Sequence, residues 1–84
     1  MEMELKQAEA AIEAVLFTKG ESVEVSKLAA AIDHDEDTTR KIVHNMMDKY
    51  EAEDRGIKII ELENAFPFFI PLQYLQLNPG LLQP

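Results

Sequence analysis

The sequence predicts a mainly α-helical domain with a small β element, arranged as a winged helix-turn-helix: three helices plus a short strand or incomplete wing. Three stretches with apolar residues at helical spacing come first. A short turn joins the second stretch to the third, as in helix-turn-helix motifs. A β-branched stretch follows and runs into a turn. We therefore expect a winged-helix domain over residues 1–65, followed by a tail over residues 66–84.

The first helix is predicted from about Met3 to Phe17. Gly20 follows it and is expected to end it, because glycine readily adopts the left-handed conformation found after helix C-termini. Apolar residues recur at steps of three and four and mark the face that turns to the core. They are Leu5, Ala8, Ile12, Val15 and Leu16.

The second and third helices are predicted at residues 25–32 and 36–52. Asp35 is the expected N-cap of the third helix, since a carboxylate there accepts hydrogen bonds from free backbone N–H groups. The acidic residues after it suit the positive end of the helix dipole. The apolar stripe of the third helix consists of Ile42, Val43, Met46, Met47 and Tyr50.

A strand is predicted over residues 57–63, which are rich in β-branched residues and mostly alternate in polarity. A turn should follow, with Asn64 able to adopt a left-handed conformation. The return strand of the wing should then begin near Phe66. Pro67 and Pro71 lack the N–H that a ladder needs, so a long central strand is excluded and only an edge strand is expected.

The helical and strand periodicities together predict the core. Eleven residues are expected to be buried: Leu5, Ile12, Val15, Leu16, Leu28, Ile32, Ile42, Val43, Met46, Ile57 and Ile59.

The charge and the absence of cysteine narrow the possible functions. Sixteen acidic and eight basic residues give a net charge of −8, which repels nucleic acid at long range. The chain has no cysteine, so thiolate chemistry and thiolate metal sites are absent. No catalytic constellation or phosphate-binding loop is visible. We therefore expect neither an enzyme nor a cofactor or metal site.

Two patterns suggest a site but have simpler interpretations. Asp33, Asp35 and Asp37 are spaced like the start of a calcium loop, yet Thr38 and His44 occupy the positions that need glycine and glutamate. A helix cap explains the acidic turn better. His34 and His44 lie on different predicted elements and are interpreted as surface residues.

The third helix offers a second class of function, a transcription regulator that binds DNA. Its polar residues Arg40, Lys41, Asn45 and Lys49 could reach bases or phosphates. Acidic residues such as Asp48 and Glu51 share the same helix. A solvated helix of mixed charge is the favoured interpretation, and DNA binding remains the alternative.

The tail differs sharply from the domain in composition. The last charged residue is Glu63, and all four prolines lie beyond it. The longest proline-free run, residues 72–78, is far shorter than the roughly 20 apolar residues of a membrane span. We expect the tail to pack as an irregular strap on the chain's own core or on a second copy. The candidate partner or dimer contacts are Phe66, Phe68, Phe69, Ile70, Leu72 and Tyr74.

The domain resembles the N-terminal winged-helix domain of the segregation and condensation protein B (ScpB) family. The resemblance covers about residues 5–66 and is carried by apolar positions and turns. Beyond residue 66 the tail does not look like the family, whose wing continues with a charged return strand and whose members have a second winged-helix domain. The matching segments are residues 12–17, 20–23, 28–32, Tyr50 and residues 54–59.

The resemblance implies a non-catalytic accessory subunit of the bacterial SMC–kleisin condensin complex, which condenses and segregates chromosomes. It further implies a homodimer that binds the kleisin subunit (ScpA) and, through it, SMC. The expected location is the cytoplasm, in association with the nucleoid through the complex. Neither specific DNA binding nor membrane association is expected.

Overall fold

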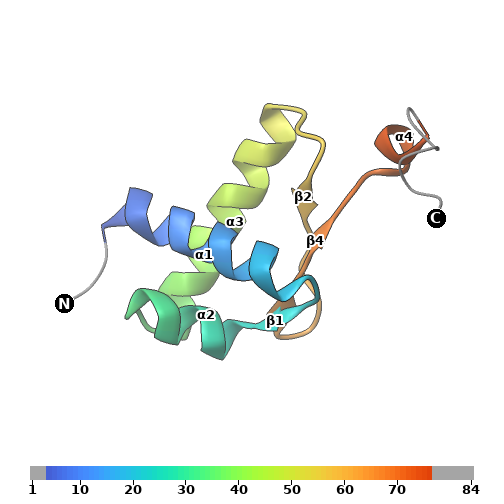
Figure 1. The fold of residues 1–84 in the computed structure, drawn as a ribbon. Helices are drawn as coiled ribbons and strands as arrows, with labels where there is room; N and C mark the ends of the chain where they lie inside the picture. The colour runs from blue at the N-terminus through green and yellow to red at the C-terminus, as the bar shows by residue number, and fades with distance from the viewer. Residues whose placement is uncertain (1–3, 77–84) are drawn as a thin grey trace.

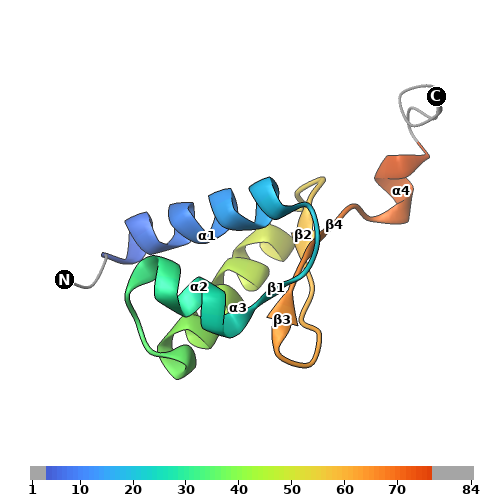
Figure 2. The ribbon, with the colours of Figure 1, turned by 60° about the horizontal axis from the view of Figure 1, so that its bottom comes forward.

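The computed structural model describes residues 4–76 and has the helix and strand order of a winged helix (Figure 1). Three helices form the body, two short two-stranded sheets lie beside them, and a final short helix projects away (Figure 2). In chain order the elements are α1 (Leu5–Lys19), β1 (Val23–Glu24), α2 (Val25–Ile32), α3 (Glu36–Ala52), β2 (Lys58–Ile59), β3 (Ala65–Phe66), β4 (Phe68–Phe69) and α4 (Leu72–Leu75).

Left-handed residues end the first two helices. Gly20 has a φ of 68° and its N–H donates to the Leu16 carbonyl at 3.2 Å, which confirms the predicted end of α1. Asp33, with a φ of 58°, ends α2 in the same way. Asn64 is not among the described residues with positive φ, so its predicted left-handed conformation is wrong.

The start of α3 is the predicted one. Asp35 is its N-cap residue and Glu36 and Asp37 occupy the first turn, but the Asp35 carboxylate makes no capping hydrogen bond, so that part of the prediction is wrong. The pKa of Asp35 lies below its usual value, mainly because of a hydrogen bond with the Thr38 side chain. Thr39 is fully buried, and its hydroxyl donates to the Asp35 carbonyl at 2.8 Å. The buried hydroxyl is therefore satisfied by the turn that precedes the helix.

The return segment of the wing is divided into two short strands, which pair with different partners. β3 pairs antiparallel with β1, and β4 pairs antiparallel with β2. Each of these strands has one partner in a two-stranded sheet, so residues 65–69 form short edge strands, as predicted, and no long central strand. Pro67 accepts a hydrogen bond from Ile60 N–H at 3.2 Å but cannot return one. The proline therefore removes one backbone hydrogen bond between the strands. It does so at the residue where the return segment changes its partner from β1 to β2.

The core lies where α1, α2 and α3 meet the sheet. Nine of the eleven predicted residues are buried or partly buried and pack together. Leu5 and Ile57 are wrong: their exposed fractions are 52% and 38%. Leu5 lies in the first turn of α1, where the helix extends beyond its neighbours (Figure 1). Ile57 precedes β2, so the strand's alternation does not fix its direction.

Candidate partner-binding surface

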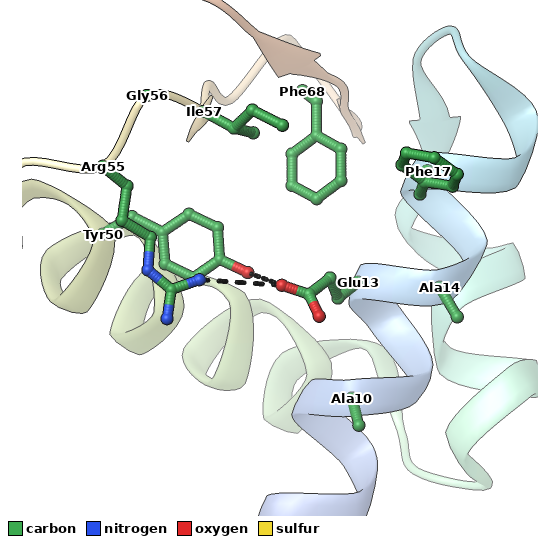
Figure 3. Close-up of a pocket in the computed structure, with 9 residues that line it drawn as sticks. All are labelled: Ala10, Glu13, Ala14, Phe17, Tyr50, Arg55, Gly56, Ile57 and Phe68. Atoms are coloured by element: carbon green, nitrogen blue, oxygen red, sulfur yellow. Dashed lines mark hydrogen bonds and ion pairs between the residues drawn. The ribbon is translucent and has the colours of Figure 1, made fainter.

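An open apolar groove of about 720 Å³ lies between α1, the C-terminal end of α3 and the wing (Figure 3). Ala10 and Ala14 line it along α1. Phe17, Ile57 and Phe68 border the groove with apolar surface. The lining residues are Ala10, Glu13, Ala14, Phe17, Tyr50, Arg55, Gly56, Ile57 and Phe68.

A polar cluster closes one side of this groove. The Tyr50 hydroxyl donates to Glu13 Oε2 at 2.6 Å, and Arg55 Nη1 lies 3.7 Å from the same oxygen. The Arg55 guanidinium sits 4.3 Å from the centre of the Tyr50 ring, within the range of a cation–π contact. Burial, reinforced by the hydrogen bond to Glu13, raises the pKa of Tyr50 to about 12. The cluster thus fixes the groove wall with its charges paired internally.

A smaller hollow of about 230 Å³ continues the groove towards the end of the wing. Both cavities are lined by Phe17, Ile57 and Phe68, so they form one apolar surface. Phe69 and Ile70 extend it, with exposed fractions of 42% and 45%. We call the groove and the hollow together the apolar surface. Phe17, which is 74% exposed, is the most exposed of its large apolar side chains and is not among the predicted contacts.

The predicted partner contacts are distributed between the core and the outside. Phe66 is fully buried and therefore cannot meet a partner in the folded domain, which corrects that prediction. Phe68 is partly buried and stacks on Tyr50 with ring centres 6.4 Å apart. Leu72 is 67% exposed. Tyr74 Oη donates to the Asp54 carbonyl at 3.3 Å. The partner role of these tail residues stays a prediction.

The outer face of α3 carries cations that are paired with acids. Arg40 donates to Asn64 Oδ1 at 2.7 Å and lies 3.6 Å from Glu61. His44, which is exposed as predicted, is 2.9 Å from Glu61. The wing therefore places a carboxylate over the part of α3 that would read DNA.

Further along α3, Lys49 is paired with Glu9 of α1 at 3.0 Å. This contact ties the outer end of α3 to the first helix. The cation is thereby close to a carboxylate, which weakens the positive field that it offers to a phosphate.

Residues 4–76 contain neither a metal-binding cluster nor a membrane-spanning helix. Within that part of the chain, no three His, Cys, Asp or Glu residues gather in a metal-binding arrangement. None of the helices described there is both long and apolar enough to cross a membrane. The acidic turn at Asp33, Asp35 and Asp37 instead forms the end of α2 and the start of α3.

The described geometry defines a winged-helix domain with an apolar surface between its first helix and its wing. The family described as "Segregation and condensation complex subunit ScpB" matches residues 10–84, so the match extends into the segment expected to depart from the family. This chain belongs to the ScpB family. The prediction that its tail diverges from the family pattern, and the division after residue 65, stay predictions.

Relatives of known sequence and structure agree with this assignment. Segregation and condensation protein B of Lachnoclostridium phytofermentans is 67% identical over 64 residues, which is 76% of this chain and 34% of that protein. The chain thus spans about a third of that relative. The crystal structure of ScpB from Mycobacterium tuberculosis matches with a TM-score of 0.88 and 20% identity, covering 98% of this chain and 51% of that one; this supports the fold.

A further solved structure is described as a dimer of an ScpB N-terminal domain complexed with an ScpA peptide. It matches with a TM-score of 0.82 and 27% identity, covering 92% of this chain and 96% of that one. This chain is therefore similar over most of its length to an ScpB N-terminal domain.

Proposed function

We propose that this chain is a non-catalytic interaction module: a dimerising, kleisin-binding accessory subunit of a bacterial SMC–kleisin condensin complex. It would act in the cytoplasm, in chromosome condensation and segregation, and reach SMC through the kleisin ScpA. The observation that carries the proposal is the match to an ScpB N-terminal domain dimer with an ScpA peptide, over 92% of this chain.

The surface chemistry supports a protein partner. The apolar surface is formed by exposed aromatic and aliphatic side chains, among them Phe17 and Ile57. Surfaces of this kind mark interaction sites in small proteins. The nearby charges of Glu13 and Arg55 lie close together, so a partner that covers the groove meets a charge pair rather than an isolated charge.

The same domain is poorly suited to bind DNA on its own. Protein–DNA affinity depends on cations that neutralise phosphates. The net charge of −8 opposes this, and Arg40 and Lys49 on α3 are paired with carboxylates. We therefore favour the interaction module over a winged-helix transcription regulator.

Light scattering and peptide titration test the proposal together. The chain should elute with about twice its 9.5 kDa mass at micromolar concentration. A labelled peptide from the central part of the same organism's ScpA should raise fluorescence anisotropy, while a scrambled peptide should not. Salt-dependent binding to duplex DNA, with no response to the ScpA peptide, would overturn the proposal in favour of a regulator.

A further inference from the structure

Exposed apolar residues are concentrated on one part of the molecule. Seven large apolar side chains are exposed within residues 4–76. Five of them lie on the apolar surface or just beyond it in the chain: Phe17, Ile57, Phe69, Ile70 and Leu72. Such clustering indicates a surface that is covered in the working state of the protein.

Residues 70–76 form an arm that leaves the domain after the wing. Figures 1 and 2, in two orientations, show α4 projecting away from the three-helix body. Ile70 is 45% exposed and Leu72 is 67% exposed. The arm carries no charged residue. One contact to the body is the hydrogen bond from Tyr74 Oη to the Asp54 carbonyl, at 3.3 Å.

The groove and the arm have matching chemistry and adjoin each other. The groove presents alanine methyl groups and aromatic rings, and its charged wall is paired internally. The hollow that continues the groove is lined by Phe69 and by Ile70, which is the first residue of the arm. The apolar groove and the apolar arm are therefore adjacent on the same chain.

We propose that two copies of this chain exchange arms, so that Leu72 of each copy packs in the groove at Ala14 and Phe17 of the other. The inference rests on the proposed function and deepens it, since it assigns the dimer contact to specific residues. A two-fold axis near the base of the arm would make both contacts equivalent.

A second copy suits these observations better than a peptide. A peptide in the groove would leave the arm of the same chain exposed, whereas mutual exchange covers both features at once. Two chains of net charge −8 repel each other. An uncharged arm in a groove with paired charges keeps that repulsion away from the contact. The matched structure of a dimer covers 92% of this chain, so a dimer-forming part of the family is represented here.

Cross-linking between two single-cysteine variants tests the exchange directly. The natural chain has no cysteine, so the label is unique. Ala14→Cys with an affinity tag, mixed with untagged Leu72→Cys, should form a covalent heterodimer with a short bismaleimide. Glu36→Cys replaces Ala14→Cys in the control. Position 36 is exposed and lies 14 residues before Tyr50 on α3, roughly 21 Å along the helix. It should give no heterodimer.

Charge substitutions test the same contact without a label. Leu72→Asp and Ala14→Glu should each raise the Kd for dimerisation at least about tenfold. Burial of one leucine side chain contributes about 1.5–3 kcal/mol, and a loss of about 1.4 kcal/mol already raises a Kd tenfold. Leu62→Asp is the matched control. Leu62 is 45% exposed and lies on the wing outside both cavities. Its substitution should leave the Kd unchanged, and all three variants should keep the helical circular-dichroism spectrum.

Each contrary result has a distinct meaning. A dimer that persists in Leu72→Asp and Ala14→Glu, without the 14–72 cross-link, overturns arm exchange but leaves the proposed function intact. Ala14→Glu that abolishes ScpA-peptide binding while keeping the dimer assigns the groove to the peptide, which also overturns it. A wild-type chain that stays monomeric at all concentrations overturns arm exchange and the proposed dimer together.

Discussion

Phe66 and Leu72 belong to the same uncharged, proline-containing segment but have opposite environments. Phe66 is fully buried among the three helices, whereas Leu72 is 67% exposed on the arm. The difference arises from strand pairing. Phe66 pairs with Val23 of β1, which directs its side chain into the core, and the pairing with β2 ends at Phe69. Composition marks the segment as apolar, but backbone pairing decides which apolar residues become core.

The largest expected effect follows from this contrast. Phe66→Ala removes a fully buried ring and should lower the free energy of unfolding by about 3–5 kcal/mol. That is close to the whole stability, on the order of 3–5 kcal/mol, of so small a domain. Thermal melts by circular dichroism should therefore show a largely unfolded variant.

Leu72→Ala is the matched variant in the same segment. Its side chain is mostly in solvent, so the free energy of unfolding of the monomer should change by less than about 0.5 kcal/mol. Melts should be made at equal, low concentration, because dimerisation itself shifts the melting temperature. Equal destabilisation by the two substitutions would show that the arm packs on its own domain.

The second test repeats the comparison on α1, with adjacent residues. Leu16 is 1% exposed and Phe17 is 74% exposed. Leu16→Ala should cost about 2–5 kcal/mol of unfolding free energy, and Phe17→Ala less than about 0.5 kcal/mol. Urea titrations of both variants measure the difference. A costly Phe17→Ala, or an unchanged midpoint for Leu16→Ala, would mean that the buried face of α1 is assigned wrongly.

Sequence periodicity was sufficient for the three helices and most of the core. The regular spacing of Ile12 and Leu16 on α1, and of Val43 and Met46 on α3, defines faces that the structure buries. A helix's own hydrogen bonds fix its side-chain directions, so a local pattern carries that information. The same reasoning failed at Leu5 because no local signal tells how far a neighbouring helix extends.

The candidate site was harder to predict because it depends on contacts between distant segments. The groove joins Ala14 and Phe17 of α1 to Ile57 and Phe68, which are at least 40 residues away in the sequence. Ile57 is predicted in the core because the strand is predicted to begin at residue 57, which would place Ile57 on the same face as Ile59. The observed strand begins at Lys58, so Ile57 lies outside it and is exposed. The sequence signal for Phe17 as a contact residue is its position as a large aromatic residue near the end of the first helix, shortly before Gly20.

The third test concerns the polar wall of the groove, where Tyr50 meets Glu13. Tyr50→Phe removes a hydrogen bond of 2.6 Å to a carboxylate and should cost about 1–2 kcal/mol of unfolding free energy. The phenol's pKa is about 12 in the folded domain against 10.0 for an unperturbed tyrosine. The folded state thus holds the proton more tightly than the unfolded chain.

The pH dependence follows from that sign. The contribution of the Tyr50 proton to stability is complete below about pH 10 and is lost as the pH rises to about 12. Urea unfolding of wild type and Tyr50→Phe should therefore converge over this range. The substitution itself is the control, since other groups that titrate there are common to both chains. A constant gap up to pH 12 would contradict the raised pKa.

A small effect is also expected at Pro67, where the return strand passes from one partner to the other. Pro67→Ala restores an N–H that can donate to the Ile60 carbonyl, worth about 0.5–1.5 kcal/mol. It also frees the unfolded chain, which costs about 0.4–1 kcal/mol. The two nearly cancel, so the free energy of unfolding should change by less than about 1 kcal/mol.

Hydrogen exchange separates these two opposing contributions. The new amide at position 67 should exchange more slowly than an unprotected amide if it completes the ladder with Ile60. An unprotected amide with lower stability would mean that the strand is held by Phe66 in the core rather than by its ladder. A large gain in stability would instead mean that the missing bond, more than side-chain burial, limits the wing. The position of Pro67 between the buried Phe66 and the exposed Phe69 makes it the point where the two influences can be distinguished.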